Sequence, residues 1–164
     1  MALLADTLAT ELKAMALFDN EADAIDAWAE AFSTYFEDAA SAVLGASPIL
    51  AAAIPPAETL MKAGMTGLST AGPAAIQAGI VAFWGSLVAN VSNPVTQAWA
   101  TVTLIVPPVL LTGIAAALTT LFATNTAGSV AKDAAFDAIA ASIHTNNQGG
   151  LATWPNPVLV QAIL

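Results

Sequence analysis

The chain contains a long segment without a single charged side chain, which runs from Ala63 to Ala131. A segment of this length that lacks charges is poorly suited to contact with water, so something must cover it. The cover comes from the chain's own fold, from neighbouring subunits or from lipid. These alternatives separate a self-contained domain, an assembly subunit and a membrane protein.

Most of the charge lies in the first 38 residues, which hold nine of the twelve acidic groups and only Lys13 as a base. The chain has 164 residues, three lysines, no arginine and a formal net charge of −9. This balance excludes nucleic-acid binding through a basic face, and it excludes a polybasic membrane anchor. We interpret the acidic block as a surface that faces solvent or a basic partner.

The composition excludes several further kinds of site. The chain has no cysteine, so it has no disulfides and no thiolate metal ligands. Its hydrophobic content of 57% is too high for an intrinsically disordered chain. Asp19, Glu21 and Asp23 lack the glycine and the spaced glutamate of a calcium loop. The sequence therefore predicts no metal site and no cofactor.

Apolar residues at spacings of three and four predict an all-α fold, a compact bundle of about five or six helices. Leu4, Leu8, Leu12 and Met15 form one such stripe, which predicts a helix over residues 2–17. Further helices are predicted from Asn20, as an N-cap, to about Leu44, and over residues 55–65, 74–91, 109–124 and 129–144. The buried side of the helix after Asn20 is expected to carry Ile25, Trp28, Phe32, Tyr35, Ala39 and Val43.

Two segments do not follow the helical pattern. Residues 99–106 are rich in β-branched side chains, so we expect a short strand or an extended segment there. The tail after Thr145 has a Gly-Gly pair and two prolines, which predict an extended arm. We therefore divide the chain into a helical domain, 1–145, and an extended C-terminal arm, 146–164, docked on its own domain or on a neighbour.

The sequence offers no constellation of catalytic residues. His144 is the only histidine, and the chain has no Gly-x-Ser-x-Gly motif and no phosphate-binding glycine loop. A carboxylate pair such as Glu37 and Glu58 could act as acid and base, but nothing distinguishes it from other acidic residues. We therefore predict that the protein is not an enzyme.

Two uncharged segments, 74–92 and 100–123, are long enough to span a bilayer. The mean hydropathy of +0.73 agrees with such spans. However, Ala, Thr, Gly and Ser dominate them, and no Lys/Arg cluster flanks either segment. We therefore keep a small integral membrane protein, holin-like or channel-like with spanning helices in 74–123, as the alternative to an assembly subunit.

A series of short motifs extends over most of the chain. The motifs are Asp23 to Ala29, Phe83-Trp84, Pro107-Pro108 to Asn125-Thr126, Ile143-His144-Thr145, and Gly149 to Pro157. In this layout the chain resembles small Ala-rich, acidic structural proteins of tailed bacteriophages. The resemblance implies a virion structural protein of the tail, neck or baseplate region, and it implies no catalytic residues.

We therefore expect a non-enzymatic virion protein that is assembled in the host cytoplasm and acts by subunit packing. Its expected partners are copies of itself and other virion structural proteins, without nucleic acid or a small-molecule substrate. The predicted interface residues are Trp154, Pro155, Pro157, Val158, Leu159 and Ile163 in the arm, with Trp84 and Trp99 as packing anchors.

Overall fold

The computed structural model describes most of the chain, and it is mainly helical, as the sequence predicts. The described residues are 4–15, 18–42, 48–91, 104–106, 116, 119, 129–147, 151–155 and 158–162. The helices are α1 (Ala5–Ala14), α2 (Glu21–Ala42), α3 (Pro48–Gly64), α4 (Leu68–Ala71), α5 (Pro73–Val91) and α7 (Ser129–Asn147). The predicted helix over 109–124 lies outside the described residues, apart from Ala116 and Thr119.

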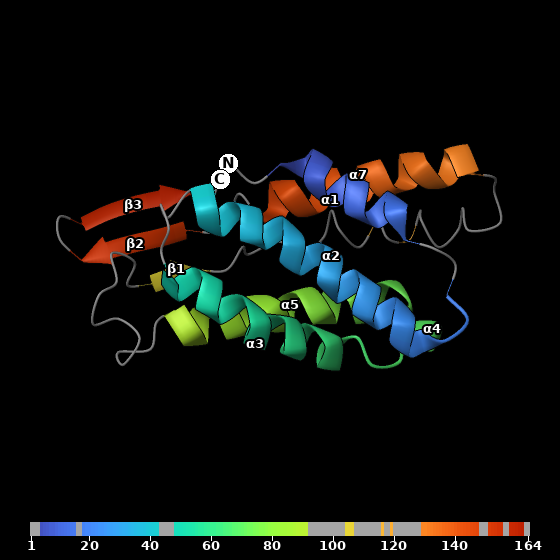
Figure 1. The fold of residues 1–164 in the computed structure, drawn as a ribbon, viewed down its shortest axis with the longest axis horizontal. Helices are drawn as coiled ribbons and strands as arrows, with labels where there is room; N and C mark the ends of the chain where they lie inside the picture. Colours follow the sequence, from blue (N-terminus) through green and yellow to red (C-terminus); the bar gives the residue numbers. More distant parts are fainter. Residues whose placement is uncertain are drawn as a thin grey trace.

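The helices form a bundle in which α2 has a central place. In Figure 1, α1 and α7 lie side by side along one edge of the bundle, α3 and α5 lie along the other, and α2 crosses between the two pairs. This arrangement places α2 in contact with both pairs, so its apolar side is covered and its acidic side remains outside.

The start of α2 confirms the predicted N-cap. The backbone N–H of Asp23 donates to the Asn20 Oδ1 at 2.9 Å, and the Asn20 amide donates back to Asp23 Oδ2 at 2.8 Å. The first bond satisfies a backbone N–H that an uncapped helix would leave unpaired, and the second joins the two side chains. On the predicted buried side, Trp28, Phe32 and Tyr35 are buried and Ile25 is partly buried, whereas nothing is described for the side chains of Ala39 and Val43.

The third helix begins earlier than predicted. We expected Pro55 and Pro56 to start it, but α3 begins at Pro48 and contains both prolines in its interior. Proline lacks the N–H that would bond the carbonyl four residues earlier, so an interior pair leaves two carbonyls without helical partners. Both prolines are exposed, which leaves their side of the helix open to water.

The core is built around aromatic rings that join α2 to α5. Phe83 on α5 packs with its ring centroid 4.9 Å from those of both Phe32 and Phe36 on α2. The Phe36 ring also meets Trp84 edge-on at 5.3 Å. Such tilted and edge-to-face pairs add stability beyond the burial of apolar area. The core thereby covers one face of α5, part of the uncharged segment.

Helices α3 and α5 approach closely at two glycines. A Cβ at Gly79 would lie 2.5 Å from Met65 Cγ and 3.1 Å from the Met61 carbonyl oxygen. A Cβ at Gly64 would lie 3.0 Å from the Gly79 Cα. Glycine at these positions therefore lets the two backbones meet.

A small antiparallel sheet is attached to the helices. Its strands β1 (Leu104–Val106), β2 (Leu151–Pro155) and β3 (Val158–Ala162) lie in the order β1-β2-β3. Strand β1 falls within the segment 99–106, where a short strand is predicted, and it also contacts α5. Figure 1 shows β2 and β3 as a pair at one end of the bundle.

Candidate functional site

The predicted arm contains a pair of strands. Trp154 pairs with Leu159, and Pro155 pairs with Val158, in the antiparallel register of β2 and β3. Strand β2 also pairs with β1, so this part of the arm docks on its own chain. The other two predicted arm contacts, Pro157 and Ile163, lie outside the described residues.

Of the two predicted packing anchors, the structure describes Trp84 but not Trp99. Trp84 is only 2% exposed, and its ring is enclosed by the chain's own aromatic core. It is therefore an internal packing residue, and our prediction of Trp84 as a contact residue for a neighbouring chain is wrong. Its apolar ring packs best where it excludes water, which here is inside the bundle. Trp99 lies outside the described residues.

Trp84 also belongs to a buried polar cluster at the contact of α2, α5 and α7. Its indole N–H donates to Asn147 Oδ1 at 2.9 Å, and Asn147 is fully buried. Nearby, the Tyr35 hydroxyl lies 2.9 Å from His144 Nδ1. Burial raises the pKa of Tyr35 far above its usual range and lowers the pKa of His144. The cluster therefore holds both groups neutral at pH 7, and it cross-links three helices.

His144 is not placed as a catalytic base by this cluster. Its Nδ1 is occupied by the Tyr35 hydroxyl, and Asp133 and Asp137, the acids considered from the sequence, lie on exposed positions of the same helix. Asp137 instead pairs with Lys13, which ties α7 to α1. The described contacts of His144 are thus those of a structural histidine.

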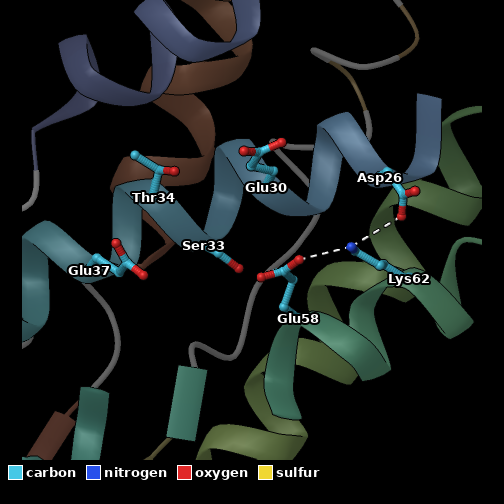
Figure 2. Close-up of a pocket in the computed structure, with 7 residues that line it drawn as sticks. All are labelled: Asp26, Glu30, Ser33, Thr34, Glu37, Glu58 and Lys62. Carbon is cyan, nitrogen blue, oxygen red and sulfur yellow. Dashed lines mark ion pairs between the residues drawn. The ribbon is translucent and has the colours of Figure 1, made fainter. Parts of the chain in front are cut away.

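A polar depression lies between α2 and α3. Figure 2 shows an open groove lined by side chains of both helices. The lining residues are Asp26, Glu30, Ser33, Thr34, Glu37, Glu58 and Lys62. The lining contains four carboxylates and one ammonium group, so the groove carries a net negative charge.

One end of the groove is closed by an ion-pair network. Lys62 Nζ lies 2.9 Å from Glu58 Oε1 on its own helix and 3.1 Å from Asp26 Oδ1 on α2. Hydrogen bonds to these two carboxylates, first that to Glu58, raise the pKa of Lys62. Figure 2 shows Lys62 between the two acids. Both ion pairs are partly exposed to solvent, so they add little to the stability of the fold. Their main effect is to hold the Lys62 side chain at one end of the groove.

The groove contains Glu37 and Glu58, the carboxylate pair considered from the sequence. Glu58 is ion-paired with Lys62 on its own helix. The excess of carboxylates over ammonium groups in the lining suits electrostatic binding of a positive group.

Sequence reasoning missed this groove. Asp26, Glu30, Ser33 and Glu37 follow helical spacing along one face of α2, which was visible in the sequence. That α3 lies opposite them was not visible, because α2–α3 packing is a tertiary contact. The signal was the acidic stripe itself, which we had interpreted only as a surface facing solvent or a basic partner.

Another acidic side chain, outside the groove, forms hydrogen bonds that link two helices. Glu21, at the start of α2, accepts hydrogen bonds from the Gly67 N–H at 2.8 Å and the Ser69 N–H at 3.1 Å, and from the Ser69 hydroxyl. These bonds, first that of the Ser69 hydroxyl, lower the pKa of Glu21. The carboxylate thereby ties the start of α2 to the turn that begins α4.

Within the described residues, no group of three acidic or histidine side chains is arranged to hold a metal ion. Comparison with known proteins gave no matching family model, no matching curated protein and no matching solved structure. The function is therefore argued from the chain's own surfaces.

Proposed function

We propose that this protein is a non-enzymatic structural subunit that acts by packing in a multi-protein assembly, the virion of a tailed phage. The tail, neck or baseplate is the setting that the sequence resemblance implies. The observation that carries the proposal is that β3 is an edge strand of the small sheet among the residues that the structure describes.

Strand β3 is one of the two edge strands of the sheet among the residues that the structure describes, and β1 is the other. Its sequence, Val158 to Ala162, contains three branched apolar residues, one glutamine, one alanine and no charge. Edge strands expose unpaired N–H and C=O groups, and proteins that stay monomeric usually protect them with lysine, proline or a bulge. An apolar edge strand whose sequence contains neither lysine nor proline therefore supports strand addition by a neighbouring subunit.

The proposal is tested by the size of the full chain in detergent-free solution, measured by analytical ultracentrifugation. We expect a defined oligomer, and we expect Val160→Lys to shift it to the monomer, because a lysine on an edge strand opposes pairing. Val81→Lys is the matched control, since Val81 is 54% exposed and lies on α5, outside the strands. It should leave the oligomer intact.

Two outcomes would contradict this role. A wild-type chain that is monomeric at every concentration would remove the basis for self-assembly. If the oligomer persists in Val160→Lys but dissociates in Val81→Lys, the interface lies on α5 and not at the sheet edge. Deletion of residues 151–164 provides a second test, in which assembly is lost while helical circular dichroism is retained.

The alternative function, a small integral membrane protein, is favoured by one observation. The window Pro73–Asn90 of α5 is long and apolar enough to cross a bilayer, and 44% of that window is buried inside the chain. The core helix of a soluble protein passes the same test. Val81 lies at the centre of this window, where a lysine disfavours membrane insertion by about 3 kcal/mol. Wild-type chain in the membrane fraction, released by Val81→Lys, would support the alternative.

A further inference from the structure

We propose that the acidic groove between α2 and α3 binds a cationic segment of a different protein, through arginine or lysine side chains that pair with its carboxylates and hydrogen-bond to Ser33. This inference goes beyond the assembly role, because it concerns other elements than the sheet edge and a partner other than a second copy. It rests on four features of the groove.

The first feature is a buried polar atom without a partner. Ser33 is 5% exposed, and its Oγ makes no hydrogen bond although it is shielded from water. Figure 2 shows the hydroxyl pointing into the groove, toward the Glu58 carboxylate. Buried hydroxyls are nearly always hydrogen-bonded, and an unpaired one lowers stability. A ligand N–H that reaches the floor of the groove would supply the missing partner.

The second feature is uncompensated charge. Glu30 and Glu37 line the groove from α2, are exposed, and have no ion pair among the described residues. Lys62 neutralises only the end of the groove, where it contacts Glu58 and Asp26. That contact demonstrates within this structure how an ammonium group lies between the two helices. Glu30 and Glu37 line the rest of the groove, and no lysine among the described residues pairs with them.

The third feature is the shape of the charged surface. Asp26 and Glu37 are eleven residues apart on one helix, which corresponds to about 16 Å along the axis. No group of described acidic side chains is arranged for a metal ion. Charges distributed over this length match a segment of polypeptide with several basic side chains better than a single small ion.

The fourth feature excludes a second copy of this chain as the source of the cations. The chain has a net charge of −9, so two copies repel each other at an acidic surface. Its three lysines are engaged already: Lys13 pairs with Asp137, Lys62 lies in the groove itself, and Lys132 lies 5.5 Å from the Phe136 ring centroid. The occupant is therefore a basic segment of another protein.

The test uses the full chain and a fluorescent arginine-rich peptide, with binding followed by anisotropy at near-physiological salt. A peptide with citrulline in place of arginine keeps the shape and removes the charge, and spermidine represents a small free cation. We expect the arginine peptide to bind, and the citrulline peptide and spermidine to bind at least about tenfold more weakly.

Matched charge variants separate the groove from the overall charge. Glu30→Gln with Glu37→Gln should weaken peptide binding by about fivefold or more, because each change removes one pairing carboxylate. Glu11→Gln with Asp133→Asn changes the net charge equally on α1 and α7, outside the groove. Equal weakening by both double variants would overturn the proposal, since the peptide would then only respond to net charge.

Ser33→Ala provides a test in which stability and binding move in opposite directions. Removal of an unpartnered buried hydroxyl should leave the melting temperature of the free chain unchanged or higher, while peptide binding weakens by about threefold. If Ser33→Ala binds the peptide as tightly as the wild type, the hydroxyl does not contact the peptide and the proposal is overturned. If spermidine binds as tightly as the arginine peptide, the groove binds small cations and not a polypeptide segment, which would overturn the proposal. Ultracentrifugation of Val160→Lys is read separately, so loss of assembly and loss of peptide binding remain distinguishable.

Discussion

The Tyr35 hydroxyl and His144 Nδ1 lie 2.9 Å apart, although 109 positions separate the two residues in the chain. This contact joins α2 to α7, and the bond from Trp84 to Asn147 joins α5 to the same end of α7. Apolar contacts tolerate small shifts between helices, whereas hydrogen bonds require particular distances. The two bonds therefore help to define where α7 packs on the bundle.

Tyr35→Phe tests this contact. The change keeps the ring in the core and removes only the hydroxyl, so His144 loses its partner in a part-buried position. We expect the free energy of unfolding, measured by urea denaturation, to fall by about 1 kcal/mol. In a double-mutant cycle with His144→Ala, the two losses should not add. Additive losses would show that the two side chains do not interact in solution.

The same cluster predicts a dependence of stability on pH. Burial lowers the pKa of His144 below its ordinary value of 6.5, so the unfolded chain binds this proton more readily than the folded chain. The contribution of neutral His144 is complete above pH 6.5 and is lost as the pH falls from 6.5 through the folded-state pKa. Urea midpoints should therefore decrease over this range, and His144→Gln should flatten the decrease. A wild-type midpoint that rises toward acid would contradict the assignment.

The parts of the fold that local signals control were predictable from the sequence. Asn20 correctly predicted the start of α2, and the helix predicted over 74–91 matches α5, which spans Pro73–Val91. The start of α3 was not predictable, because Pro55 and Pro56 normally end or begin helices. The pairing of β2 with β1 joins residues that are far apart in sequence, and local pattern carries no information on such pairing.

The candidate surfaces were predictable only in part. The arm was expected to be extended, and the structure pairs Trp154 with Leu159 and Pro155 with Val158. Trp84 was expected at an interface, yet it is buried with Phe36, because a lone tryptophan looks the same in a sequence on a surface and in a core. Ser33 could not be singled out, since its unpaired hydroxyl is defined only once α3 covers it.

Glu21→Gln tests the link between α2 and α4. The carboxylate accepts hydrogen bonds from the Gly67 and Ser69 N–H groups, and a neutral amide accepts them more weakly. We expect a lower thermal midpoint for this variant at pH 7, with Asp133→Asn as an exposed control. Because these bonds lower the pKa of Glu21 from 4.5, its contribution is present above pH 4.5 and is lost as the pH falls through the folded value. The two proteins should therefore converge at strongly acidic pH, and a difference that persists there would contradict a role for the charge.

The close approach of α3 and α5 predicts opposite effects of one substitution at two positions of a single helix. In Gly79→Ala, the new methyl group would lie 2.5 Å from Met65 Cγ, so the helices must separate or Met65 must move. We expect a loss of about 1–3 kcal/mol in the free energy of unfolding, as for other overpacked cores. In Gly85→Ala, the new methyl group meets nothing within 4 Å, and alanine favours the helix, so the chain should gain about 0.5–1 kcal/mol. Both values come from urea denaturation of the two variants beside the wild type. Equal stabilisation by both changes would mean that α3 and α5 do not touch at Gly79.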